Sequence, residues 1–175
     1  MASDTAPDSV DWEAVYWEQT PRLYNFFRYR TGDGDLAKDL TAKTMLRAWR
    51  YRHRYQADLG AFEAWLFQIA RNVAKDSFAA RQRQPLPLDA VPDVAAPLSV
   101  EREVQRRQQA EQLYRLIAQL PQTDQDLVAL KYGAELTNRK IADLLNLSES
   151  NVGTRLHRLL TKLRRQWEMH HALPE

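Results

Sequence analysis

The chain has 175 residues, enough for one domain or two small ones, and a net charge of +2 from 25 basic and 23 acidic residues. This charge is too small for a general polyanion binder, and the absence of cysteine excludes disulfides and cysteine-ligated zinc. The sequence has no apolar run long enough to cross a membrane and no signal-peptide pattern, so we expect a cytoplasmic protein.

Three segments in the first half of the chain have the apolar spacing of helices. The first runs from Val10 to Arg30, and Pro21 is expected to kink or restart it. A turn at residues 31–35 caps the second segment, Leu36 to Arg54, and the third runs from Ala61 to Gln84. In the second segment the expected core residues are Leu36, Leu40, Met45, Leu46 and Trp49. These segments predict a compact unit of three or four helices.

The composition changes after the third helix. Residues 85–99 hold four prolines and no basic residue, so they are expected to form an extended linker between two helical domains. A second helical unit is predicted over residues 100–170. It starts with a charged helix from Val100 to Leu120, and a short helix from Asp124 to Tyr132 follows, with Gly133 as its expected C-cap. The predicted fold class is therefore all-α, with two small domains.

The stretch from Leu136 to Trp167 predicts two helices joined by a tight turn. Thr137 can cap the first helix and Ser148 the second, while Asn146 tolerates the left-handed conformation that the turn requires. The second helix has an apolar stripe and an opposite face of polar and basic side chains: Ser150, Asn151, Thr154, Arg155, His157 and Arg158. This pattern is typical of a helix-turn-helix that reads the major groove of DNA. The alternative is an ordinary helical hairpin with a solvated basic face.

A second group of residues suits exposed nucleic-acid bases. Trp49, Tyr51 and Tyr55 alternate with basic residues between Arg47 and Arg54. Stacking on aromatic rings and contacts to phosphates are the interactions that hold unpaired bases. Trp49 falls on the apolar stripe and is expected in the core, whereas Tyr55 is expected to have a functional role.

Together the two units resemble the extracytoplasmic-function (ECF) sigma factors, which contain only sigma regions 2 and 4. The resemblance covers Val10 to Trp167. Four stretches carry it: DLTAKTMLRAW from Asp39, FEAWLFQIARNVAKD from Phe62, LPQTDQDLVALKYGAELTNRKIADLL from Leu120, and LSESNVGTRLHRLLTKLR from Leu147.

The resemblance implies a function and a set of site residues. A sigma factor binds core RNA polymerase, at the beta-prime coiled coil and the beta flap, and directs it to promoters by recognising −35 and −10 elements and assisting DNA melting. The implied polymerase-binding residues are Asp39, Leu40, Lys43 and Arg47. The implied −10 residues are Arg52, Tyr55, Gln56, Asp58, Arg71, Asn72 and Lys75, with residues 55–60 as a loop that holds a flipped base above Asn72. The implied −35 residues are Arg139, Ser148, Ser150, Asn151, Thr154, Arg155, His157 and Arg158.

The sequence departs from the family pattern at two places. Ala42 and Lys43 stand where the family usually has Gln-Glu, which reverses a charge on the expected polymerase-binding helix. Gly153 stands where the family usually has a basic residue in the −35 helix, and a glycine within a helix costs roughly 1 kcal/mol. Neighbouring residues are then expected to supply the −35 contacts.

Other classes of function have weaker support. Glu168, His170 and His171 are not expected to bind a metal, no cofactor is predicted, and no nucleophile–base pattern argues for an enzyme. Expected partners are core polymerase, promoter DNA and an anti-sigma factor. A helix-turn-helix regulator that acts without polymerase, and a helical decoy or adaptor protein, remain the alternatives.

Overall fold

The computed structural model describes residues 10–56, 61–83 and 101–171, and these residues contain helices and no strand. The first helical unit comprises α1 (Trp12–Thr31), α2 (Gly34–Arg50), the short η1 (Arg52–Arg54) and α3 (Phe62–Arg83). The second helical unit comprises α4 (Glu101–Ala118), α5 (Gln122–Val128), the π-helical turn η2 (Ala129–Gly133), α6 (Asn138–Leu145) and α7 (Glu149–His171). The predicted all-α class is confirmed. The predicted proline-rich linker, residues 85–99, lies outside the described residues.

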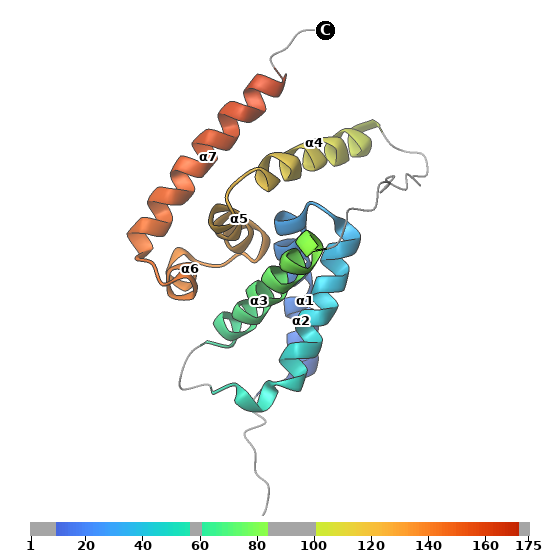
Figure 1. The fold of residues 1–175 in the computed structure, drawn as a ribbon, viewed down its shortest axis with the longest axis vertical. Helices are drawn as coiled ribbons and strands as arrows, with labels where there is room; N and C mark the ends of the chain where they lie inside the picture. Colours follow the sequence, from blue (N-terminus) through green and yellow to red (C-terminus); the bar gives the residue numbers. More distant parts are fainter. Residues whose placement is uncertain (1–9, 57–60, 84–100, 172–175) are drawn as a thin grey trace, which may run out of the picture.

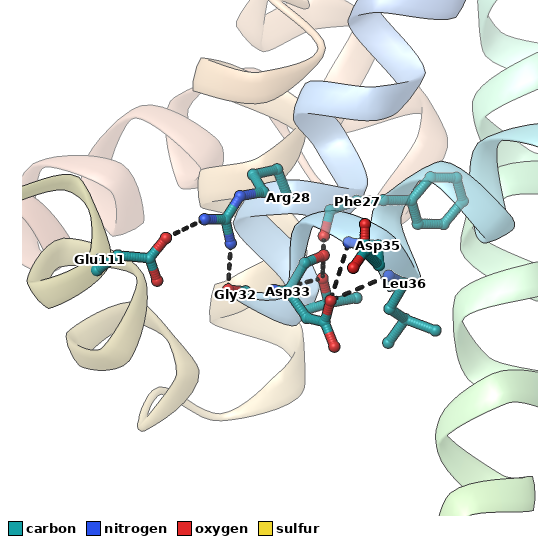
Figure 2. A network of polar contacts seen from close by, with 8 residues as sticks. Phe27, Arg28, Gly32, Asp33, Asp35, Leu36 and Glu111 are labelled. Atoms are coloured by element: carbon teal, nitrogen blue, oxygen red, sulfur yellow. Dashed lines mark hydrogen bonds and ion pairs between the residues drawn. The ribbon is translucent and has the colours of Figure 1, made fainter. Parts of the chain in front are cut away.

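The helix ends are set by local hydrogen bonds. The Asp11 carboxylate accepts from the backbone N–H groups of Glu13 and Ala14, which begins α1. Gly32, at a φ of 68°, ends α1, and the Asp33 carboxylate caps α2 by accepting from the N–H groups of Asp35 and Leu36. Figure 2 shows this turn, which agrees with the cap predicted at residues 31–35.

Two expectations about the helices need correction. The α1 helix does not restart at Pro21, because it runs without a break from Trp12 to Thr31, and the kink expected there as the alternative stays a prediction. The carbonyl that Pro21 cannot pair with belongs to Trp17, whose side chain is 71% exposed, so water can reach this side of the helix. Gly133 is also not a left-handed C-cap, because Gly32 is the only described glycine with a positive φ. The left-handed residue after η2 is Glu135.

The core runs through both helical units without a break. Phe26 and Phe27 on α1 are fully buried, and the Phe26 ring makes edge contacts with Phe27 and with Phe67 on α3. The same apolar cluster extends to Leu130 on η2 and Ile141 on α6. Figure 1 shows η2 and α5 between the first unit and the long α7. The first unit therefore has the second unit as a direct packing neighbour.

Gly133 explains how closely the two units approach. A Cβ atom at this position would lie 2.8 Å from backbone atoms of Asn25 and Phe26 on α1, nearer than real Cβ atoms come. Glycine is therefore required at residue 133 by the contact with α1 and not by its own backbone angles. No helix within the described ranges is both long and apolar enough to cross a membrane.

Candidate nucleic-acid interface

The predicted helix-turn-helix forms as expected from α6 and α7. The Thr137 hydroxyl accepts from the Lys140 N–H at the start of α6, and the Ser148 hydroxyl accepts from the Asn151 N–H at the start of α7. Asn146 takes the left-handed conformation at a φ of 54°. Ile141, Ala142 and Val152 are buried where the two helices cross. The turn and both caps agree with the sequence prediction.

The outer face of α7 presents most of the predicted −35 residues to solvent. Exposed side chains on this face and its flanks are Arg139, Ser148, Ser150, Asn151, Thr154, His157 and Arg158. Arg155 differs, because it is half-buried and pairs with the Asp124 carboxylate of α5 at 2.8 Å. Its guanidinium group therefore ties α7 to α5 in the free chain. The remaining face supplies hydroxyl, amide, imidazole and guanidinium groups, which suit hydrogen bonding to base edges and phosphates.

Gly153 lies on the half-buried side of α7, beside α6. A Cβ atom there would be 3.6 Å from the Asn138 amide nitrogen, which is an ordinary van der Waals contact. Because nothing excludes a side chain, we expect Gly153→Ala to raise the free energy of unfolding by about 0.5–1 kcal/mol through helix propensity. Urea denaturation of the full chain measures this change. A loss of stability would mean that the α6–α7 crossing needs glycine.

An exposed polar stripe follows one side of α3. Gln68, Asn72 and Lys75 are exposed and spaced at one and two helical turns. The Gln68 amide donates to the Asn72 side-chain oxygen at 3.4 Å, a long hydrogen bond between two exposed groups. Asn72 therefore has an accessible amide, as base reading would require. This contact of Asn72 lies within α3, and residues 57–60 of the loop before the helix lie outside the described part of the chain.

Arg71 does not belong to this open stripe. Its Nε atom lies 3.3 Å from the Asp126 carboxylate of α5, and its Nη1 atom donates to the Leu144 carbonyl of α6 at 3.1 Å. These two partners are in the second helical unit, and Nη1 also donates to the Gln68 side chain of α3 at 3.3 Å. In this arrangement the Arg71 guanidinium group, which was predicted to contact the −10 element, is already bound by protein groups.

The aromatic residues before α3 form a cluster of their own. Tyr55 is half-buried, with ring centroids 5.3 Å from Phe62 and 5.5 Å from Trp65. Gln56 is exposed, whereas Asp58 lies in residues 57–60, outside the described part of the chain. The structure therefore gives Tyr55 an aromatic packing environment, and the predicted base-holding loop stays a prediction.

Two residues expected in the core lie at the surface instead. Trp49 is 48% exposed, with its ring edge-on to Trp12 and under the Arg52 guanidinium group, and Leu46 is 55% exposed. Both follow the apolar stripe of α2 but are covered only in part, since α1 and α3 bury the side of α2 that holds Leu40 and Ala48, and α1 reaches Trp49 through the Trp12 ring alone. Arg52 is exposed and free to face solvent on its other side.

The predicted polymerase-binding residues of α2 divide into surface and core. Asp39 and Lys43 are exposed, and Arg47 pairs with Asp76 of α3 at 2.9 Å across the surface. Leu40 is fully buried, so in this arrangement its side chain cannot contact polymerase as predicted. Leu40 instead packs in the core and holds α2 there.

Beside these α2 residues lies an apolar groove that the sequence analysis missed. It has a volume of about 680 Å³ and lies between α1 and α2, where its lining includes Tyr16, Tyr24, Met45 and Leu46. Next to the groove, Trp17 is 71% exposed and its ring is edge-on to Tyr16. The adjacent aromatic residues 16 and 17 could have indicated an apolar surface in the sequence. Two successive helical positions cannot both face one core, so one of the two rings had to lie outside it.

Comparison with known proteins agrees with this division into two helical units. The model of sigma-70 region 2 matches residues 17–84, and the model of sigma-70 region 4 matches residues 110–163. The ECF RNA polymerase sigma factor SigM of Bacillus subtilis is 26% identical over 152 residues, 87% of this chain and 92% of SigM. SigL of Mycobacterium tuberculosis, also an ECF RNA polymerase sigma factor, is 28% identical over 168 residues, 94% of this chain and 93% of SigL.

Two solved structures share the fold. CnrH, in complex with the cytosolic domain of CnrY, has a TM-score of 0.68 at 18% identity, covering 90% of this chain and 88% of CnrH. The sigma factor RpoE, in complex with the anti-sigma factor NepR from Bartonella quintana, has a TM-score of 0.67 at 17% identity, covering 90% of this chain and 97% of the other.

Proposed function

The chain belongs to the ECF type of RNA polymerase sigma factor, and from this premise we propose how its surfaces divide the work of promoter-directed transcription initiation. The first unit, residues 10–84, binds core polymerase and the −10 element. The second unit, residues 100–170, binds the −35 element through α7, and residues 85–99 join the two. The observation that carries this proposal is that each matched sigma region presents an exposed polar face on one helix, α3 or α7.

Polymerase binding is assigned to α2 and the adjacent groove. Asp39, Lys43 and Arg47 supply charges at the surface, and Leu46 with the α1–α2 groove supplies apolar area. Apolar area and charged groups side by side are what a stable protein interface requires. The partners inside polymerase are the beta-prime coiled coil for this surface and the beta flap for the second unit.

DNA binding is divided between the two exposed faces. Thr154, His157 and Arg158 read base edges of the −35 element, while Arg139, Ser148, Ser150 and Asn151 lie nearer to phosphates. Asn72 reads a flipped −10 base, and Lys75 and Arg52 contact the backbone. Arg71 and Arg155 join these contacts only after leaving their carboxylate partners.

The function is tested by run-off transcription with purified core polymerase on promoter DNA selected by the reconstituted holoenzyme. We expect the protein to bind core polymerase as a monomer and to support transcription only in that complex, which acts in the cytoplasm. Stable dimers that bind a palindrome tightly without polymerase would indicate a regulator instead. Failure to bind any promoter would indicate a decoy. An anti-sigma factor is a further expected partner, as in the RpoE–NepR complex.

Asn72 provides the sharpest test of −10 recognition. Asn72→Ala should remove about 1–3 kcal/mol of preference at one −10 position, because an amide can donate to and accept from one base edge. Core binding and folding stability should stay near wild type, since the side chain is exposed. Open-complex formation on promoters permuted at each −10 base measures the change. Gln82→Ala is the matched control, an exposed amide near the end of α3, and should alter no base preference.

A contradictory result for Asn72 is easily distinguished. If Asn72→Ala loses several kcal/mol of folding stability and its activity falls equally on every −10 sequence, then the side chain has a structural role and the base-reading assignment is wrong.

A further inference from the structure

We propose that Gln68 determines which end of the Asn72 amide faces the −10 base. Gln68 holds the Asn72 oxygen, so Asn72 offers its N–H donors and selects a base that carries a keto oxygen. This inference rests on the proposed function and names the chemical class of base that the same site takes. Gln68 is a positioning residue, because it acts on the base through Asn72. We call the hydrogen-bonded chain from Arg71 through Gln68 to Asn72 the amide relay.

The amide relay follows from the helical spacing within α3. Gln68 lies three residues before Arg71 and four residues before Asn72, and side chains at these spacings are neighbours on a helix surface. Gln68 and Asn72 are both exposed, and the hydrogen bond between them joins two successive turns of one helix. The relay is therefore local to α3 and lies on the face that is assigned to the −10 element.

Arg71 fixes the orientation of the Gln68 amide. The Nη1 atom of Arg71 donates to the Gln68 Oε1 atom at 3.3 Å. A guanidinium group has donors and no acceptor, so only the oxygen end of the Gln68 amide can bind to it. Gln68 therefore turns its Nε2 donors away from Arg71. Because a guanidinium group carries several N–H donors, Arg71 can contact a DNA phosphate and keep this hydrogen bond.

The orientation of Gln68 in turn sets that of Asn72. The Gln68 Nε2 atom donates to the Asn72 Oδ1 atom at 3.4 Å. The reverse orientation of Asn72 would place its own N–H donors against those of Gln68, which forms no hydrogen bond. The Nδ2 group of Asn72 therefore points away from Gln68 and is the end of the amide that meets a base. A base that covers the amide excludes water, and both hydrogen bonds of the relay strengthen in the lower local dielectric.

A donor from Asn72 distinguishes two classes of base. Guanine and thymine carry a keto oxygen that accepts a hydrogen bond, whereas adenine and cytosine carry an amino group that donates one. The usual bidentate pairing of asparagine with adenine needs the asparagine oxygen for the adenine amino group, and here Gln68 holds this oxygen. We therefore expect a keto base at the −10 position that Asn72 reads.

Substitutions of Gln68 can reverse or remove this restraint without changing Asn72. In Gln68→Glu the new carboxylate accepts from Arg71 but has no donor, so Asn72 must turn its Nδ2 group toward residue 68 and its oxygen toward the base. In Gln68→Ala the Asn72 amide can present either end. A side chain with a merely structural role would instead change binding to all bases equally. The base preference at one position thus separates the two roles of Gln68.

The test compares promoters that differ in one exocyclic group of one base. Asn72→Ala first identifies the −10 position that the amide reads. That position then carries thymine or 5-methylcytosine, or hypoxanthine or adenine where the site takes a purine, because each pair keeps its shape and exchanges a keto oxygen for an amino group. The analogue is placed in each strand in turn, within a −10 region that mismatches hold unpaired, so the cost of melting does not enter. Competition for the reconstituted holoenzyme measures the affinity ratio.

Wild-type holoenzyme is expected to bind the keto promoter roughly tenfold more tightly than the amino promoter, within the discrimination that base-edge contacts provide. Gln68→Glu should prefer the amino promoter, and Gln68→Ala should bind the two within about threefold of each other. Gln82→Glu is the matched control, since it adds the same charge at an exposed amide of α3, about 21 Å along the helix, and should keep the wild-type ratio. A uniform loss of affinity from the added charge cancels in each ratio.

Two results would overturn the proposal. One is a wild-type holoenzyme that prefers the amino base or does not distinguish the two. The other is a wild-type ratio in Gln68→Glu, or in Gln68→Ala where Gln68→Glu binds too weakly to measure. An Asn72→Ala variant that changes no base preference would also overturn it, together with the base-reading assignment. Failure of the proposed function is distinct from all of these, because it is a failure of wild-type run-off transcription.

Discussion

Leu46→Asp is expected to abolish transcription from every promoter by preventing binding to core polymerase. Leu46 is the most exposed large apolar side chain on α2, and it lines the apolar groove. It lies in sequence between the predicted contact residues Lys43 and Arg47. A carboxylate there would be buried without a partner when polymerase covers the groove, and burying an unpaired charge is strongly unfavourable. We expect affinity for core polymerase to fall by about 100-fold or more, equivalent to about 2.8 kcal/mol.

Competition with labelled wild-type protein for core polymerase measures this loss. The fold should survive, because Leu46 is 55% exposed in the free chain. Met169→Asp on α7 is the matched control, since Met169 is 64% exposed and belongs to none of the predicted sites. Core binding by Leu46→Asp at the wild-type level would exclude the α1–α2 groove from the polymerase interface.

Phe26→Ala is expected to destabilise the whole chain, because one ring supports the core of the first unit and its contact with the second unit together. Phe26 is fully buried, its ring contacts Phe27 and Phe67, and its Cα atom lies against Gly133. Removing a buried aromatic ring costs about 3–5 kcal/mol, a large part of the roughly 5–15 kcal/mol that stabilises a typical protein.

Urea denaturation of the full-length chain, followed by circular dichroism, measures the loss. The control is Trp17→Ala on the same helix, where a larger ring is 71% exposed and its removal should cost less than about 0.5 kcal/mol. Equal losses in the two variants would show that α1 does not bury Phe26 in solution. A fall in stability confined to one of two separate transitions would show that the core of the two units is not continuous.

The sequence by itself determined the helices and the helix-turn-helix. The caps at Asp11, Asp33, Thr137 and Ser148 hydrogen-bond to backbone groups two or three residues away, and Asn146 is a single left-handed position. Such interactions depend only on residues within one turn, so their pattern is readable in the chain. The outward face of α7 follows from helical period for the same reason.

Only the tertiary structure decided which cations are available and which apolar residues are covered. Arg71 and its partners in the second unit are 55 and 73 positions apart, and Arg155 and Asp124 are 31 apart, so no local pattern reveals that these guanidinium groups are engaged across the two units or between α5 and α7. Periodicity placed Leu46 and Trp49 on the apolar side of α2 but could not tell that α1 and α3 leave about half of each side chain exposed. Gly133 ends η2 as expected, but glycine is required there by the backbone of α1, which lies where a Cβ atom would be. Helical period gives the direction of a side chain, whereas its neighbour is set by packing between segments distant in the chain.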